Sequence, residues 1–562
     1  MRNRLSFLPL SCLVMFSLAG CGVSSSPSTS VATDDPFASL EEKLTPLATQ
    51  CTFVASSGLM TVSVAAGETA IISRRAADSA ILQNGASCDN LATNSTVKKV
   101  QVNGTGGAKT VILDFTNGFF AVGTSSSATS GIAVDLGTGG GNTLGIRGTT
   151  GADNIAYGAG GVNLNNDTFK DITIANVANN TIYLGDGADT FTASGSTATG
   201  AVFGAALTVY GGAGADLFNE GTAATPSETI YGGADVDTVT YTSRVAGVTV
   251  TVGATANDGA TTGELDDINS DVEIVTGSSA ADTMTAAPGV AITFNGGAGN
   301  DTLIGDTAAD TLNGEAGSDT LRGKAGNDVL NGGDGDDTFD EEIATNGGDT
   351  FNGGNGIDTV DYSARTGAGV VVTMDGTVAN DGFALEADNV KADVENLIGS
   401  DQADTITGNA SANVITGGLG NDTLNGGAGD DIFNEGSATS GLDTISGGTG
   451  VDTIDYSART NPVIVVLNGS TGSGEASEGD LLGTDTENVI GTAGDDTITG
   501  NASANELVGG AGDDILNGLA GDDTLEGGGG IEANVLDCGA GDGDIGFGEG
   551  TGTGFSRTNC EF

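Results

Sequence analysis

Apolar residues recur every nine positions through residues 296–340, and this spacing organises the chain. In nine-residue units read from Gly296, the first position is always Gly, the sixth is always Asp and the eighth is always apolar. The last three residues of each unit, such as Thr302-Leu303-Ile304, alternate as a short strand does. Glycine at the first position, and often at the fourth, permits a tight turn. The pattern therefore predicts short strands separated by turns.

Two units should return the chain to its starting side, so that strands stack in parallel and the eighth positions meet in one thin core. A single unit cannot bury its apolar face alone, and stability therefore depends on stacking. The predicted fold class is all-β, a parallel solenoid of nonapeptide repeats. The expected core residues are Leu303, Leu312, Leu321, Leu330 and Phe339.

The sixth-position aspartates should lie in a row, one turn above another. Carboxylates that close repel one another, so the row requires a cation. Carboxylate and turn carbonyl oxygens are hard ligands, and the chain contains no His. This ligand set suits Ca²⁺ better than Mg²⁺, which demands a stricter octahedron. A simple turn role for Asp is the alternative, and it is stronger for isolated copies.

Degenerate copies extend the pattern from Gly148 to Glu526. Asp153 and Asp189 hold the acidic position in the first two, whereas Asn413 and Asn505 replace the acid by a weaker, neutral ligand. These units resemble the haemolysin-type (RTX) calcium-binding nonapeptide. The resemblance implies a parallel β-roll or β-helix with several Ca²⁺ ions held between adjacent turns. The ligands expected are Asp216, Asp237, Asp301, Asp310, Asp319, Asp328, Asp337, Asp358, Asp404, Asp422, Asp431, Asp452, Asp496, Asp514 and Asp523.

A longer unit occurs three times among the nonapeptides. Each copy contains a Tyr and an Arg, then a β-branched run, and then an acidic loop that ends in Glu273, Glu395 or Glu487. We interpret it as a strand pair spliced between roll segments, whose Tyr and Arg close the roll and neutralise neighbouring Glu. A site for a sugar carboxylate is the alternative. The residues concerned are Tyr241, Tyr362, Tyr456, Arg244, Arg365 and Arg459.

Composition narrows the classes of function. The 562 residues include 96 Gly and carry a formal net charge of −58, which argues against nucleic acid as a partner. The lack of His excludes a Ser-His-Asp triad and a His-Glu-x-x-His zinc site. We expect a non-enzymatic protein. The alternative is a carboxylate-only or calcium-dependent enzyme (lyase, epimerase or glycosidase) acting on acidic polysaccharide.

Residues 1–20 resemble a bacterial lipoprotein signal peptide. Arg2 and Arg4 precede an apolar stretch that is too short for a membrane span, and a Leu-Ala-Gly-Cys sequence ends at Cys21. The resemblance implies cleavage before Cys21 and lipid on its thiol, and Gly22 in place of Asp implies sorting to the outer membrane. A secretory signal without lipidation is the alternative. We expect a lipoprotein at the bacterial cell surface, whose partners are Ca²⁺, the membrane, and a surface polysaccharide or another surface protein.

Four cysteines remain once the signal peptide and the lipidated thiol are set aside. Export favours disulfides, and four thiols allow three pairings. The local choice pairs Cys51 with Cys88 and Cys538 with Cys560, which would brace the two ends of the solenoid.

These patterns divide the chain into successive segments. They are 1–20 signal peptide, 21–50 flexible tether, 51–147 β-rich N-terminal cap or first coils, 148–295 degenerate repeats with the first spliced unit, 296–361 main calcium-binding block, 362–398 spliced unit, 399–455 second repeat block, 456–490 spliced unit, 491–526 third repeat block and 527–562 C-terminal cap. Together they predict a calcium-binding, lipid-anchored structural or adhesive protein.

Overall fold

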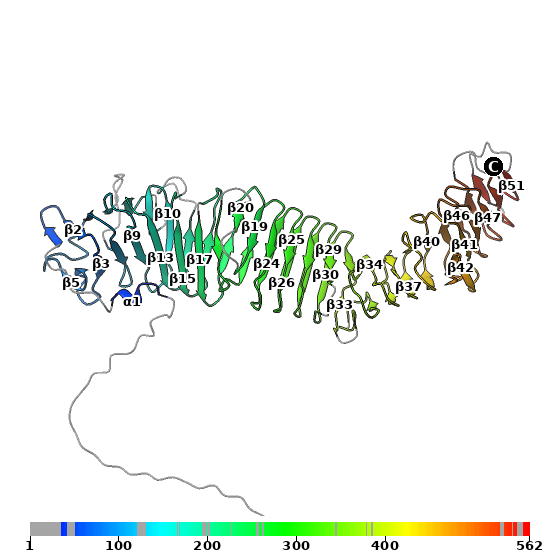
Figure 1. Cartoon of the computed structure of the whole chain (residues 1–562), viewed down its shortest axis with the longest axis horizontal. Helices are drawn as coiled ribbons and strands as arrows, with labels where there is room; N and C mark the ends of the chain where they lie inside the picture. Colours follow the sequence, from blue (N-terminus) through cyan, green and yellow to red (C-terminus); the bar gives the residue numbers. More distant parts are fainter. Residues whose placement is uncertain are drawn as a thin grey trace, which may run out of the picture.

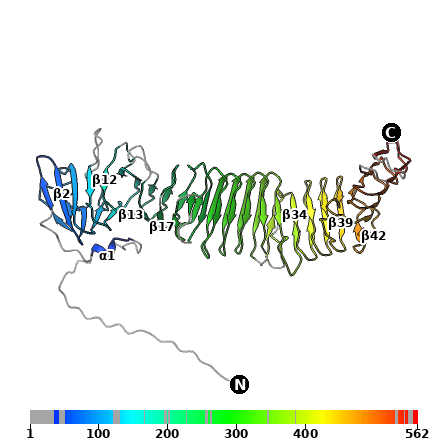
Figure 2. The same cartoon turned by 45° about the horizontal axis from the view of Figure 1, so that its top comes forward.

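The chain forms an elongated rod in which short strands stack along the long axis (Figure 1). Its C-terminal end bends away from that axis, as the turned view shows (Figure 2). The computed structural model describes residues 35–41, 51–120, 131–165, 167, 169–193, 199, 203–225, 227–253, 258–260, 264–342, 346–377, 379–383, 386–528, 533–541, 543–547 and 555–561. The expected signal peptide and Cys21 lie outside these residues.

Two sheets build the N-terminal half of the rod. The first sheet has 16 strands, in the order β1 (Cys51–Val54), β2 (Leu59–Ala65), β6 (Lys99–Thr105), β8 (Ile132–Asp135), β12 (Ile172–Ala175), β11 (Gly161–Asn163), β10 (Asn154–Gly158), β14 (Thr190–Thr192), β16 (Leu217–Asn219), β18 (Thr238–Thr240), β22 (Ile274–Thr276), β24 (Thr293–Ala298), β26 (Thr311–Ala316), β28 (Val329–Asp334), β30 (Thr350–Asn355) and β33 (Asn389–Val390). The second has nine, in the order β21 (Asp267–Ile268), β17 (Glu228–Ala234), β15 (Leu207–Ala213), β13 (Asn179–Asp186), β9 (Thr143–Arg147), β7 (Thr110–Asp114), β3 (Thr69–Arg74), β4 (Ile81–Gln83) and β5 (Ala86–Ser87).

Two further sheets continue the rod towards the C-terminus. The third has 15 strands, in the order β20 (Gly259–Ala260), β19 (Val248–Thr251), β23 (Thr283–Thr285), β25 (Thr302–Ile304), β27 (Thr320–Arg322), β29 (Thr338–Asp340), β31 (Thr359–Asp361), β34 (Asn396–Ile398), β36 (Val414–Thr416), β38 (Ile432–Asn434), β40 (Thr453–Asp455), β44 (Asn488–Ile490), β46 (Glu506–Val508), β48 (Thr524–Glu526) and β50 (Ile545–Phe547). The fourth has 11, in the order β32 (Val371–Thr373), β35 (Thr405–Thr407), β37 (Thr423–Ala428), β39 (Thr444–Thr449), β43 (Asp480–Leu482), β42 (Thr471–Glu475), β41 (Val463–Val466), β45 (Thr497–Thr499), β47 (Ile515–Asn517), β49 (Val535–Asp537) and β51 (Ser556–Thr558).

Register in the central block confirms the two-unit turn. Thr293 of β24 lies opposite Thr311 of β26, and Thr302 of β25 lies opposite Thr320 of β27, both in parallel pairs. One turn is therefore 18 residues, with one nonapeptide in each sheet. The strands stack as the expected parallel β-roll.

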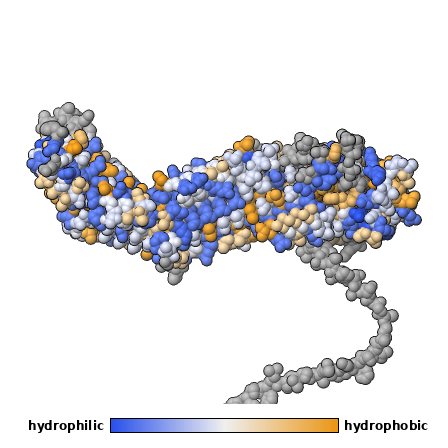
Figure 3. Space-filling view, turned by 180° about the vertical axis from the view of Figure 1, so that it is seen from behind, coloured by the Kyte–Doolittle hydropathy of each residue, from blue (hydrophilic) through white to orange (hydrophobic). Residues whose placement is uncertain are grey.

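The eighth-position side chains form the core of the roll. Leu303, Leu312, Leu321, Leu330 and Phe339 are all fully buried. Burying a side chain of this size stabilises a fold by roughly 1.5–3 kcal/mol. The face of the rod shown in Figure 3 is polar over much of its length, with apolar residues scattered along it. No helix in the described parts of the chain is long and apolar enough to cross a membrane.

The described residues within 51–147, which are 51–120 and 131–147, form the first coils of the same solenoid. Strands β2 and β6 have seven residues each, more than any strand of the central nonapeptide block, and with β8 they join the first sheet in parallel register. Met60, Val62 and Val64 alternate into the core from β2. Disulfides join Cys51 to Cys88 and Cys538 to Cys560, one near each end of the described rod.

Part of the segment expected to be a tether is docked on the rod. Phe37, just before the helix α1 (Ala38–Glu41), is buried against Ile71, Ile112 and Tyr183. Asp35 forms an ion pair with Arg147 at 2.8 Å. This apolar contact and buried ion pair hold residues 35–41, which differs from the flexible tether expected over residues 21–50.

The first two spliced units lie where one sheet ends and another begins, and the third adds antiparallel strands within one sheet. In the first unit β19 and β20 pair antiparallel, β21 ends the second sheet, and β20 starts the third. In the second unit β33 ends the first sheet and β32 starts the fourth. In the third unit β41, β42 and β43 form an antiparallel insertion within the fourth sheet. The solenoid therefore continues through all three units, although in the first two one sheet replaces another.

Candidate metal sites

The sixth-position carboxylates lie in the turns, immediately before the short strands, and form hydrogen-bonded ladders from one turn to the next. In the main block the backbone N–H of Asp301 donates to Oδ1 of Asp319 at 2.7 Å, and Asp319 N–H donates to Oδ1 of Asp337 at 2.8 Å. A parallel ladder runs from Asp310 to Asp328 at 2.8 Å. Every turn thus places its carboxylate over the next, as the periodicity predicts.

The ladder uses only one oxygen of most of these carboxylates. The other, Oδ2, is buried and has no hydrogen-bond partner within the described part of the chain. This is an expensive state for a carboxylate oxygen, because burial without a partner costs about 1–3 kcal/mol or more. The aspartates that share it are Asp189, Asp216, Asp237, Asp301, Asp319, Asp328, Asp337, Asp349, Asp358, Asp422, Asp431, Asp452, Asp523 and Asp544.

First-position glycines leave the space beside these oxygens open. A Cβ on Gly296 would collide with Oδ2 of Asp301 and with the carbonyl oxygen of Gly314 in the next turn. Gly314 stands in the same relation to Asp319 and to the carbonyl of Gly332. A carboxylate oxygen and a carbonyl oxygen from successive turns therefore approach one point. Such hard oxygen ligands fit Ca²⁺.

Many of the turns have left-handed backbone at the second and fourth positions. Gly297 has a φ of 105° and Gly299 a φ of 126°. Glu315 and Lys324 occupy the second position of their units with φ values of 73° and 69°, although non-glycine residues rarely adopt this region. Stacking against the neighbouring turns therefore fixes the turn conformation even without glycine.

A second class of turn satisfies its carboxylate internally. In these units a polar residue at the second position donates its backbone N–H to the sixth-position side chain, and its hydroxyl, where present, donates too. Thr492 donates its N–H to Oδ2 of Asp496 at 2.6 Å and its hydroxyl to Oδ1 at 2.9 Å. Ser400 does the same for Asp404. The capped residues are Asp153, Asp282, Asp310, Asp404, Asp496, Asn413 and Asn505.

The structure therefore sorts the 15 expected ligands. Asp310, Asp404 and Asp496 are capped by their own turns, so they are poorer candidates for metal than the sequence indicates. Asp514 accepts the N–H of Asp496 within the same ladder and faces Gly509. The remaining expected ligands all present a buried Oδ2 without a hydrogen-bond partner.

The nine-residue periodicity did not predict several of the aspartates that belong to the ladders. Asp349 accepts the N–H of Asp328, and Asp443 accepts that of Asp422, but both follow turns of 21 rather than 18 residues. Asp282 and Asp544 also belong to the ladders. The short signature Asp-Thr-apolar would have identified Asp349, Asp443 and Asp282, but it is not present at Asp544.

Electrostatics inside the ladders oppose ionisation without a cation. Burial, reinforced by neighbouring carboxylates, raises the pKa of Asp301 and of Asp337 to about 7. Burial raises the pKa of Asp216 to about 8, against the lowering effect of the Asp189 N–H. A cation between turns stabilises the ionised form.

The repeated Tyr and Arg are structural closures. Tyr362 and Arg365 are fully buried, and so cannot stack on or bind an external sugar. Arg365 forms ion pairs with Glu341 and, at 2.8 Å, with Glu386. Arg459 pairs with Glu478 at 2.6 Å. The interpretation that these arginines neutralise nearby glutamates is confirmed.

These features define a parallel β-roll whose turns present calcium ligands. A family model described as the RTX calcium-binding nonapeptide repeat matches residues 168–196, 293–321, 313–340, 398–433, 436–458, 483–515 and 500–531. These segments therefore contain RTX calcium-binding nonapeptide repeats, which bind Ca²⁺ between turns. A search of curated proteins found no match to the chain.

Proposed function

We propose that the protein is an extended, calcium-stiffened structural or adhesive module of the bacterial cell surface, anchored through lipid on Cys21. The observation that carries this proposal is the long series of buried Oδ2 atoms, which extends from Asp189 to Asp544. Calcium then acts along most of the rod, as structural ions do, rather than at one catalytic centre.

The shape of the molecule supports a spacing role. Strands lie across the rod and turns add along it, so each further turn lengthens the molecule by about 4.8 Å. An extended rod attached at its N-terminal end would hold its distal coils away from the membrane. The docked Phe37 leaves only the residues between Cys21 and Asp35 as the link from lipid to rod.

A calcium titration tests the structural half of the proposal. The chain without its first 21 residues is titrated with Ca²⁺, with Mg²⁺ as the control, and followed by far-UV circular dichroism and small-angle X-ray scattering. We expect Ca²⁺ alone to produce β structure and a rod-like scattering profile, at a midpoint of roughly 10⁻⁴–10⁻³ M as in extracellular sites. A compact β-rich chain in chelator, unaffected by Ca²⁺, would contradict it.

Anchoring and surface attachment need separate measurements. Wild type should incorporate a labelled fatty acid and partition with membranes, whereas Cys21→Ser should do neither. The purified rod should bind acidic surface polysaccharide or cells without shortening the polysaccharide. Release of oligosaccharide that depends on Ca²⁺ would replace the adhesive role by the enzymatic alternative.

A further inference from the structure

The three spliced units share a buried acidic cluster, but the first is partnered differently. Glu220, Glu264 and Asp266 at the first unit correspond in sequence to Glu341, Glu386 and Asp388 at the second. The third set is Glu435, Glu478 and Asp480. All these carboxylates are buried, and one arginine lies beside each set.

In the second and third copies the arginine bridges both glutamates. Arg365 contacts Glu341 and Glu386, and Arg459 contacts Glu435 at 3.1 Å and Glu478 at 2.6 Å. A polar residue adds a further bond, since Asn346 Nδ2 donates to Glu341 at 2.6 Å. The guanidinium therefore supplies the positive charge for each of these glutamates.

In the first copy the arginine donates hydrogen bonds to only one of the two glutamate side chains. Arg244 donates two hydrogen bonds to Glu264, at 2.6 and 2.9 Å. Its remaining bonds go to the backbone carbonyls of Glu220, at 3.0 Å, and Gly221, at 2.9 Å. Both carboxylate oxygens of Glu220 are thus left buried without a hydrogen-bond partner among the described residues. Oδ2 of Asp266 is in the same state.

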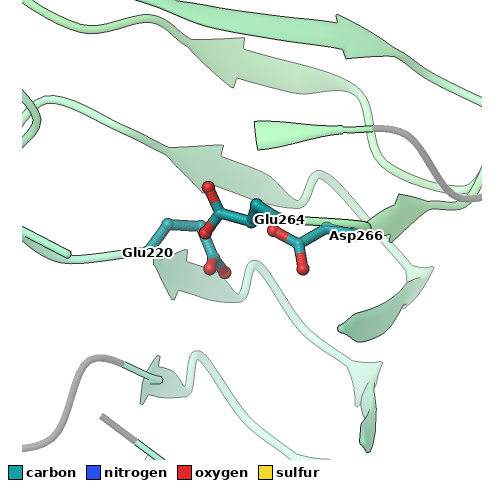
Figure 4. Close-up of side chains that lie close together, drawn as sticks. All are labelled: Glu220, Glu264 and Asp266. Carbon is teal, nitrogen blue, oxygen red and sulfur yellow. The ribbon is translucent and has the colours of Figure 1, made fainter. Parts of the chain in front are cut away.

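The three acidic side chains converge on a common space. One oxygen from each of Glu220, Glu264 and Asp266 lies within 4.8 Å of the others (Figure 4). Ca²⁺ binds oxygen at about 2.3–2.6 Å, so ligands around one ion lie up to roughly 5 Å apart. The second and third copies give no such group in the described residues. The cluster has the dimensions of a calcium site made only of side chains.

We propose that Glu220, Glu264 and Asp266 bind one divalent cation, Ca²⁺, at a site separate from the nonapeptide turns. This ion supplies at the first unit the positive charge that the bridging arginine supplies at the other two. Oxygen ligands alone favour a hard cation; the chain contains no His, and the four cysteines of the described residues form disulfides, so these groups do not favour a transition metal here.

The surroundings of the cluster agree with this assignment. Glu228 adds a fourth buried carboxylate, against the single cation Arg244. Burial and mutual repulsion raise the pKa of Glu220 and of Asp266, so removing the charge there requires either protons or a cation. The group lies where β21 ends the second sheet and β20 begins the third. An ion here would stabilise the junction at which the second sheet ends and the third sheet begins.

Anomalous scattering gives the direct test. Crystals of the wild-type chain grown with Ca²⁺, and soaked with Tb³⁺ as a stronger anomalous scatterer, should show a peak between Glu220, Glu264 and Asp266. Native mass spectrometry then counts ions in two matched variants. Glu220→Gln should hold one Ca²⁺ fewer than wild type, whereas Glu341→Gln, at the arginine-bridged copy, should hold the same number.

Two results would overturn the site. One is a wild-type crystal with Ca²⁺ or Tb³⁺ in the nonapeptide turns and no peak at the cluster, which would mean that protons neutralise it. The other is an equal calcium count in the two folded variants. If Glu220→Gln does not fold, the wild-type crystal still decides.

Discussion

The backbone N–H of Asp301 donates to Oδ1 of Asp319, one complete turn along the rod, at 2.7 Å. This bond holds one carboxylate oxygen in place and leaves the other, Oδ2, turned toward the glycine at the start of its own unit. A single side chain therefore belongs to two turns at once. Hydrogen bonding fixes its position and leaves the remaining oxygen available to calcium.

The two classes of turn predict different responses to loss of charge. Asp319→Asn keeps an oxygen acceptor for Asp301 N–H but removes the charge from a buried Oδ2, so the calcium midpoint of the neighbouring turns should rise about tenfold, equal to about 1.4 kcal/mol. Asp496→Asn is the control, because Thr492 already satisfies that carboxylate. Isothermal titration calorimetry measures both. Equal shifts in the two variants would refute the distinction.

The metal-free chain should fold better in acid. Asp301, Asp328 and Asp337 have folded-state pKa values of about 7, raised mainly by burial from an ordinary value of 3.8. Their contribution to stability is thus fully present below about pH 4 and is lost as pH rises through about 7. In chelator, β structure measured by circular dichroism should increase from pH 8 to pH 4. With Ca²⁺ the midpoint concentration should instead fall as pH rises, since protons and ions compete. β content in chelator that grows with pH would contradict this.

The core should be sensitive at the eighth position alone. Leu321→Ala removes a fully buried side chain and should cost about 2–5 kcal/mol. Leu419→Ala, at a side chain that is 49% exposed, should change stability by less than about 0.5 kcal/mol. Hydrogen exchange should place the loss of protection in the turns next to Leu321, because each repeat contacts only its neighbours. Loss of protection throughout the rod would show longer-range cooperativity than this structure implies.

Removing Arg365 should destabilise the fold, because its buried glutamate partners lose their cation. Arg365→Met leaves Glu341 and Glu386 without their cation and should destabilise calcium-loaded protein by about 3–5 kcal/mol. The triple variant Arg365→Met with Glu341→Gln and Glu386→Gln removes the charges together and should recover most of that loss. Denaturant unfolding measures each. No recovery in the triple variant would assign the effect to packing instead of charge.

Periodicity was sufficient to predict the turn length, the core positions and most of the carboxylate ladder. It missed Asp349 and Asp443 because a three-residue insertion breaks the count while the stacking continues. It also could not separate Asp496 from Asp319, because that difference depends on a local competition from the Thr492 hydroxyl.

The repeat pattern could not predict which distant residues pair with one another. Arg365 meets Glu341 and Glu386 across 24 and 21 residues, and the choice of partner depends on how the spliced strands fold back. The first coils contain no nonapeptide, so the sequence left a cap and a continuing solenoid equally open. Alternation in β2 and β6 fits both, and only the register with the first sheet distinguishes them.

The direction of the strands across the rod has a mechanical consequence. Hydrogen bonds between turns run along the long axis, so an axial pull loads them one after another instead of shearing them together (Figure 1). A released turn of 18 residues can extend to about 60 Å, from a rise of about 4.8 Å in the stack. The bond between Cys538 and Cys560 fastens the final coils covalently, which protects that end from peeling. Under tension the rod would therefore yield in short steps, one turn at a time.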